Sequence, residues 1–177
     1  MSQSLPDRKT VRLCDYDYAE GEYFVTICTE GRVHYFGEIE HGEIQLTKIG
    51  EYLKMQIENI HTHYPYAEIP LFTIMPNHVH LIVIIDDVPY VRRDAARHVP
   101  TTKNERMFVV AHCQGWLSVV VAGIKSAVTR FANENNITFA WQQRFYEHVV
   151  RSRTEMNRIA EYIEQNPYNW VTDEYNI

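Results

Sequence analysis

The hydrophobic and polar positions in the first half of the chain alternate between strand-like and helix-like patterns. Residues 22–30 (EYFVTICTE) are rich in β-branched and aromatic side chains, which predicts a strand. Two short runs on either side of His41-Gly42 predict a β-hairpin. Apolar residues then recur at helical spacing over 47–62, and Thr47 offers an N-cap, so we expect a helix there.

The second half of the chain also contains strand-like and helix-like patterns of apolar residues. We expect, in order, paired strands at 67–75 and 78–85, a long helix at 112–136, one or two strands within 137–150, and a helix at 154–166. Thr154 is the expected N-cap of the last helix. Pro167 comes directly after Asn166 and is expected to stop it.

Without the inserted hairpin, the expected order of elements is β-α-β-β-α-β-α. This order favours an α+β fold of the ferredoxin-like or RRM-like kind, an antiparallel sheet with an extra C-terminal helix. A length of 177 residues favours one domain over 1–177. Residues 1–20 have no clean period and predict an irregular arm. Residues 86–110 predict a loop that is long enough to be a candidate functional segment.

Composition and charge narrow the classes of partner only partly. The net charge of −6 disfavours a polyanionic partner, but the acidity is confined to the first 85 residues, with 12 Asp/Glu against 6 Lys/Arg. The second half is neutral and holds basic clusters that can bind phosphates. Three cysteines without C-x-x-C spacing indicate neither a disulfide framework nor a thiolate zinc site. No apolar run is long enough to span a bilayer, so we expect no membrane partner and a cytoplasmic location.

Two histidines interrupt the apolar run MPNHVHLIVII. On a strand, His78 and His80 point to the same face, about 7 Å apart at Cα. Two imidazoles in this arrangement can converge on one divalent ion. From this stretch alone, a pair of half-buried histidines bonded to backbone is the favoured interpretation.

A tyrosine and an asparagine share one face of the expected last helix. Tyr162 and Asn166 are four residues apart, and Ile159 and Ile163 on the adjoining side would seat the helix against the sheet. The pair can be an ordinary buried contact, which the spacing favours, or a nucleophile beside a third metal ligand. Tyrosine, with an ordinary pKa near 10, needs a strongly polarised electrophile such as a metal-bound phosphate.

Three segments together resemble a known family. MPNHVHLIV, WQQRFYEHVVRS and IAEYIEQNP, in this order, are similar to the motifs of HUH-type single-tyrosine transposases, and most closely to the REP-associated tyrosine transposases. The segments RLCDYDYAEGEYFVTICTEGR and GEIQLTKIG resemble a long-insert subgroup of that branch. The resemblance runs from about Arg8 to Trp170, nearly the whole chain.

The resemblance implies a metal-dependent endonuclease and strand transferase that acts on single-stranded DNA near hairpins. Tyr162 would attack a backbone phosphate, which gives a 5′-phosphotyrosine linkage and a free 3′-OH. His78, His80 and Asn166 would bind Mg²⁺ or Mn²⁺. The expected partner is DNA with REP-like palindromes, bound by a monomer or a homodimer in the bacterial nucleoid. The mechanism needs no ATP, and the chain has no G-x-x-x-x-G-K-[ST] loop.

Further positions have a weaker basis. Lys125 matches a helix that faces DNA in the family, and Arg144, Arg151 and Arg153 flank the second motif, where they can bind phosphates or be ordinary surface residues. Glu147-His148 is expected to brace the metal site or the tyrosine helix. Three aromatic residues can stack on unpaired bases, although packing in the core is favoured for them: Trp141, Phe145 and Tyr146.

Two other functions stay open at this point. One is a non-catalytic nucleic-acid-binding module on the same fold, which the intact set of motif residues disfavours. The other is a metallohydrolase in which the two histidines are joined by a carboxylate ligand, so that the tyrosine helix would be incidental. The sequence does not identify the target hairpin, the mobile element or the oligomeric state.

Overall fold

A computed structural model describes residues 21–86 and 115–176. Its centre is a four-stranded antiparallel sheet in the order β4-β5-β1-β6. The strands are β1 (Gly21–Cys28), β4 (Ala67–Met75), β5 (His78–Ile85) and β6 (Tyr146–Val150). This is the strand order of the predicted ferredoxin-like plan, with the first and third core strands at the centre.

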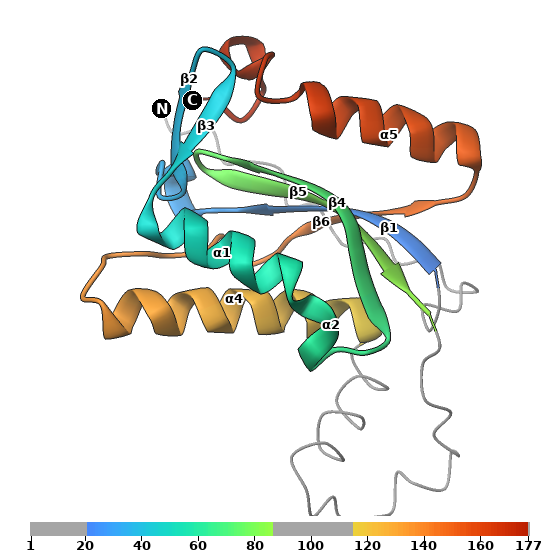
Figure 1. The fold of residues 1–177 in the computed structure, drawn as a ribbon, viewed down its shortest axis with the longest axis horizontal. Helices are drawn as coiled ribbons and strands as arrows, with labels where there is room; N and C mark the ends of the chain where they lie inside the picture. Colours follow the sequence, from blue (N-terminus) through green and yellow to red (C-terminus); the bar gives the residue numbers. More distant parts are fainter. Residues whose placement is uncertain (1–20, 87–114, 177) are drawn as a thin grey trace, which may run out of the picture.

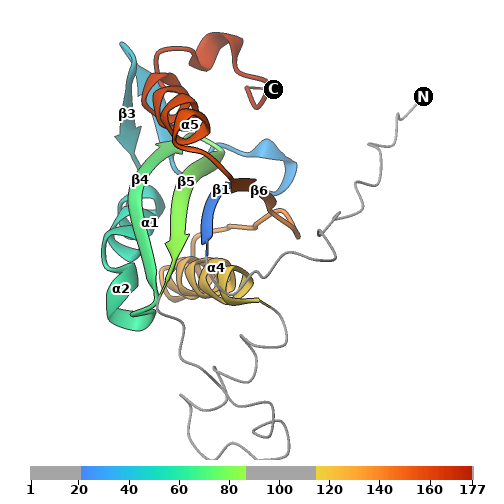
Figure 2. The same ribbon diagram turned by 90° about the vertical axis from the view of Figure 1, so that its right-hand side faces the viewer.

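The helices lie on both faces of the sheet (Figure 1). One face carries α1 (Lys48–Glu58) and α4 (Trp116–Glu134), which contact each other, and the short α2 (Ile60–His63) follows α1. The opposite face carries α5 (Arg153–Gln165), which contacts β4 and β5. Figure 2 shows α5 and α4 on opposite sides of the sheet when the molecule is turned by 90°.

The remaining elements are a hairpin and two short 3₁₀ helices. The hairpin consists of β2 (Gly37–Glu40) and β3 (Glu43–Leu46), joined through His41-Gly42 as predicted. The 3₁₀ helices are Glu30–Arg32 and Trp170–Thr172. Within the described ranges, no helix combines the length and the apolar character that a membrane span requires.

The predicted order of elements is confirmed, and several boundaries are corrected. The helix expected over 47–62 keeps Thr47 as its N-cap but ends at Glu58, and α2 begins separately after Asn59. The last helix begins at Arg153, because the Ser152 hydroxyl accepts the Glu155 N–H at 3.2 Å. The predicted cap, Thr154, is therefore wrong.

One or two strands were predicted within 137–150, and the structure has one strand there, β6. The preceding segment contributes a single isolated bridge, Trp141 to Thr29. The first strand ends at Cys28, two residues before its predicted end. The expected arm over 1–20 and nearly all of the loop expected over 86–110 lie outside the described residues.

The period-two pattern of the central strands divides the sheet into an apolar face and a mixed face. On β5, Val79, Leu81 and Val83 are buried in the main core against α1 and α4. The alternate positions point toward α5, and they include both histidines. On β1 the alternate positions of that face include Thr26, which lies directly opposite His80. The sheet thus carries buried polar side chains on the face that α5 covers.

Candidate metal and tyrosine site

His78 and His80 lie together on the α5 face of β5, as predicted. They are buried, with exposed fractions of 0% and 1%. Their rings are 4.6 Å apart, and the two Nε2 atoms face each other at 3.1 Å. The favoured interpretation of the stretch by itself, half-buried histidines bonded to backbone, is wrong, because the imidazoles are fully buried and contact side chains.

The Nδ1 atom of each imidazole has its own side-chain partner. Asn77 donates through Nδ2 to the carbonyl oxygens of Arg32 and Tyr175, which fixes its amide orientation. Its Oδ1 therefore accepts from Nδ1–H of His78 at 2.8 Å, which leaves a lone pair on Nε2 of that ring. For His80, Nδ1 pairs with the Thr26 hydroxyl at 2.8 Å.

Both imidazoles are neutral at physiological pH. Burial lowers the pKa of His78 from 6.5 to about 2, and the neighbouring His80 and Arg32 add to this shift. Burial lowers the pKa of His80 from 6.5 to about 3. Neutral imidazoles with their Nε2 atoms turned inward are the form that binds a metal ion.

Tyr162 comes from the opposite element, α5, and meets the histidine pair. Its hydroxyl oxygen lies 3.3 Å from Nε2 of His80, while the side chain keeps an exposed fraction of 42%. Burial is the main cause that raises its pKa to about 12, with carboxylates of Asp173 and Glu174 adding to the shift. The hydroxyl is a phenol at neutral pH, within reach of both the buried histidine and solvent.

Asn166 is buried one turn after Tyr162, with an exposed fraction of 2%. Its Nδ2 donates to Oδ2 of Asp173 at 3.0 Å. Its Oδ1 is buried and has no hydrogen-bond partner. A buried carbonyl oxygen without a partner is uncommon in proteins, because its desolvation costs free energy that nothing offsets.

The segment after α5 covers the histidines from the other side. The Tyr175 ring lies tilted against His78 with centroids 4.6 Å apart, and the Trp170 ring lies 6.1 Å from the same imidazole. The guanidinium of Arg32 lies 4.2 Å above the Tyr175 ring. Tyr162, in contrast to the two histidines, keeps a large exposed fraction.

The residues present fit a divalent cation. Two ligand atoms adjacent to one octahedral ion at about 2.1 Å lie roughly 3.0 Å apart, and the two Nε2 atoms are separated by 3.1 Å. The unpartnered oxygen of Asn166 offers a third, oxygen ligand. Among the described residues no cluster of three or more His, Cys, Asp or Glu side chains forms a metal site. The metallohydrolase hypothesis, which needs a carboxylate ligand, stays a prediction.

The basic residues predicted to contact DNA are not gathered at this site. Nζ of Lys125, on the α4 face, donates to the carbonyl oxygens of Gln142 and Arg144 at 2.6 and 3.2 Å, and burial lowers its pKa. Arg151 and Arg153 line a hollow of about 650 Å³ at the start of α5. Arg144 is exposed in the segment before β6. Their DNA contacts stay predictions.

The three aromatic residues of the second motif separate into two groups. Trp141 and Phe145 pack against the core, the outcome the sequence favoured for them. Tyr146 does not, because 46% of it is exposed on the α5 face of β6. His148, two residues later, bonds Glu155 of α5 at 2.7 Å and so contacts the tyrosine helix, as predicted.

Sequence reasoning missed several residues that shape the site: Phe24, Thr26, Asn77, Arg158, Asp173 and Tyr175. Asn77 stands inside the motif MPNHVHLIV, directly before His78. This position in the sequence was enough to make it a candidate site residue. Thr26 and Asp173 carry no local signal, because only sheet register and the fold of the C-terminal segment bring them to the site.

Comparison with solved structures shows that this fold is shared with one tyrosine transposase. The structure of a REP-associated tyrosine transposase bound to a REP hairpin matches with a TM-score of 0.52 and 18% identity, over 96% of this chain and 74% of that chain. At this identity the likeness shows a common fold. A protein of Deinococcus radiodurans R1, provisionally described as a transposase, matches at a TM-score of 0.40 and 19% identity, over 87% of this chain and 95% of that chain.

Sequence comparison identifies a relative that matches nearly the whole chain. No family model matches the chain. A protein of Haemophilus influenzae (strain ATCC 51907 / DSM 11121 / KW20 / Rd), described as uncharacterized, is 34% identical over 170 residues, which is 94% of this chain and 92% of that protein. The chain belongs to the same family as this Haemophilus influenzae protein.

Proposed function

We propose that the protein is a tyrosine transposase, a metal-dependent endonuclease and strand transferase that acts on single-stranded DNA near hairpins. The observation that carries this proposal is the meeting of Tyr162 with the buried histidine pair, its hydroxyl 3.3 Å from Nε2 of His80. The fold shared with a REP-associated tyrosine transposase that was solved with a REP hairpin supports DNA as the substrate. We therefore propose a hairpin of the REP-like kind as the target.

The proposed reaction is a transesterification at phosphorus. The Tyr162 oxygen forms a bond to a backbone phosphorus, and the bond from that phosphorus to the 3′-oxygen breaks. The phenol gives up its proton to solvent, and the departing 3′-oxygen takes up a proton to become a free 3′-OH. The DNA is then held by a 5′-phosphotyrosine ester, and attack by a 3′-OH on this ester rejoins DNA and restores the tyrosine.

His78, His80 and Asn166 are the residues that would hold Mg²⁺ or Mn²⁺ in this mechanism. When bound, such an ion polarises a phosphate oxygen and stabilises negative charge that develops at phosphorus and on the oxygens around it. The chain itself supplies the rest. Asn77 fixes the tautomer of His78, and Asp173 fixes the amide of Asn166 with its nitrogen turned toward the carboxylate. The Tyr175 ring packs against His78 and helps to keep both imidazoles buried.

The proposal is tested by incubating the protein with Mg²⁺ or Mn²⁺ and single-stranded DNA that carries a REP-like hairpin and a labelled end. We expect a protein–DNA adduct that survives denaturation and disappears in EDTA. Tyr162→Phe is expected to abolish the adduct while it keeps hairpin binding. Tyr168→Phe is the matched control, because that side chain is 73% exposed and lies outside the site.

The same experiment separates the alternatives. An adduct formed by Tyr162→Phe at the wild-type level would show that another residue is the nucleophile. Hairpin binding by the wild type without any adduct, in either metal, would favour the non-catalytic binding module. For the metal ligands, His80→Ala is expected to retain hairpin binding and to lose cleavage.

A further inference from the structure

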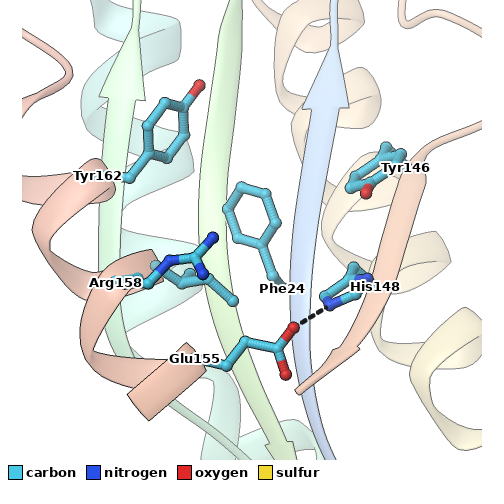
Figure 3. Close-up of a pocket in the computed structure, with 7 residues that line it drawn as sticks. Phe24, Tyr146, His148, Glu155, Arg158 and Tyr162 are labelled. Carbon is cyan, nitrogen blue, oxygen red and sulfur yellow. Dashed lines mark hydrogen bonds and ion pairs between the residues drawn. The ribbon is translucent and has the colours of Figure 1, made fainter. Parts of the chain in front are cut away.

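A cleft of about 400 Å³ opens directly beside Tyr162, between α5 and the strands β1 and β6 (Figure 3). Its floor is formed by Phe24 of β1 and Tyr146 of β6, and its wall by Arg158 and Tyr162 of α5. Tyr162 lines this cleft, and Tyr175 lies against the histidine pair outside it. Its volume is in the range of sites that bind small organic groups.

The floor of the cleft is a continuous aromatic surface. The Phe24 ring stacks on His80 with centroids 5.3 Å apart, and it meets the Tyr162 ring edge-on at 6.1 Å. On its other side it meets the Tyr146 ring edge-on at 6.2 Å. Tyr146 is 46% exposed, so a large ring face stays open to solvent at the end of this row. Exposed aromatic rings of this kind stack on unpaired nucleobases.

The wall of the cleft adds one cation. Arg158 lies one turn before Tyr162 on α5, and within the described part of the chain it makes no hydrogen bond or ion pair. The nearby Glu155 forms no ion pair with Arg158, and both of its carboxylate oxygens accept hydrogen bonds from other groups. One accepts from His148 at 2.7 Å and the other from the backbone N–H of Arg151 at 2.8 Å. The cleft therefore combines an aromatic floor with an unpaired guanidinium.

We propose that this cleft binds one unpaired nucleotide next to the phosphate that Tyr162 attacks. The base stacks on Tyr146 and Phe24, and Arg158 binds the phosphate of the same nucleotide. This inference rests on the proposed function, which supplies single-stranded DNA as the ligand. In this proposal, stacking of the base in the cleft determines which phosphate is cleaved. The cleft is separate from the surface that binds the hairpin.

The test uses Tyr162→Phe protein, which cannot form the adduct, with hairpin DNA in which 2-aminopurine replaces one unpaired nucleotide at a time. Stacking quenches 2-aminopurine fluorescence, and we expect quenching at one position beside the cleavage site. Adding Tyr146→Ala is expected to remove this quenching and to weaken binding about 10-fold. With Tyr146→Phe in the Tyr162→Phe protein, both the quenching and the affinity are expected to be kept. Tyr168→Ala, the same substitution at an exposed tyrosine outside the cleft, is expected to change neither.

A second measurement tests whether the base at the quenched position contacts Tyr146. An abasic nucleotide at the quenched position is expected to weaken binding by the same factor as Tyr146→Ala, with no further loss when the two changes are combined. Arg158→Gln is expected to weaken binding and to reduce the slope of log affinity against log salt by about 0.7, as the loss of one phosphate contact to a single strand does.

The outcomes distinguish this inference from the proposed function. If the wild type forms the adduct but no position is quenched, or if Tyr146→Ala behaves like Tyr168→Ala, the cleft does not hold a base, and the transposase mechanism stands without it. If quenching depends on Tyr146 while the wild type forms no adduct, the nucleotide site stands and the catalytic function fails.

Discussion

Acid is expected to unfold the metal-free protein through its two buried histidines. In the folded state burial holds the pKa of His78 at about 2 and that of His80 at about 3, whereas both return to about 6.5 on unfolding. Because the pKa values are lower in the folded state, the unfolded state takes up protons first as pH falls. The contribution of the two neutral histidines to the free energy of unfolding is therefore fully present above pH 6.5 and is lost progressively as the pH falls toward 3.

The size of the loss follows from the difference in pKa. At pH 4.5 the unfolded histidines are two units below their pKa, while the folded imidazoles are still neutral. Each histidine then costs between about 2 and 3 kcal/mol relative to neutral pH, and the pair costs about 5 kcal/mol. This is a large part of the roughly 5–15 kcal/mol by which a typical domain is stable.

The assay is urea unfolding in EDTA at pH 7 and at pH 4.5. We expect the free energy of unfolding of the wild type to fall by about 5 kcal/mol more than that of His78→Gln/His80→Gln, since shared carboxylate effects cancel. His61→Gln/His63→Gln, a double substitution of exposed histidines on α2, is expected to behave as the wild type. Equal losses in the wild type and the buried double variant would refute the argument. If that variant does not fold, the alternative measurement is the chemical shift of the imidazole C2 protons of His78 and His80 in the wild type. These two shifts are expected to stay constant down to pH 4.5.

Two other predictions concern single hydroxyl groups. Thr26→Val removes the partner of a histidine Nδ1 and is expected to weaken Mn²⁺ binding about 10- to 100-fold, as measured by electron paramagnetic resonance of free Mn²⁺; unchanged affinity would contradict the role given to this hydroxyl. Ser152→Ala removes the N-cap of α5 and is expected to cost about 1 kcal/mol in thermal unfolding, whereas Thr154→Ala, inside the first turn, is expected to cost clearly less. A larger loss for Thr154→Ala would restore the cap predicted from the sequence.

Most of the secondary structure was predictable, because it depends on local periodicity. The alternation in β5 placed His78 and His80 on one face, and the helical spacing placed Tyr162 and Asn166 on one face of α5. The cap of α5 was not predicted, although Ser152 and Glu155 have the S-x-x-E spacing of a capping box. This spacing favours Ser152 over Thr154, which is followed three residues later by Asn157, so the signal for the correct cap was present in the sequence.

The contacts that define the site were less predictable, since they join distant parts of the chain. Thr26 meets His80 only because β1 and β5 pair in one register. The DNA contact of Lys125 stays a prediction, and the two backbone carbonyls to which its ammonium donates are contacts that a helical pattern does not indicate. Tyr146 and Trp141 look equivalent in the sequence, yet one lines an open cleft and the other packs against the core.

The hydroxyl of Thr26 would allow the proposed metal site to exist both with and without a cation. The amide of Asn77 keeps the proton of His78 on Nδ1, so Nε2 of that ring always presents a lone pair. Without a cation, a proton on Nε2 of His80 can be donated across the 3.1 Å gap, and the Thr26 hydroxyl then donates to Nδ1. If His78 and His80 held a cation, both Nε2 atoms would have to present lone pairs, and the proton of His80 would lie on Nδ1. A hydroxyl can rotate from donor to acceptor and satisfies both forms, whereas the isosteric valine satisfies neither.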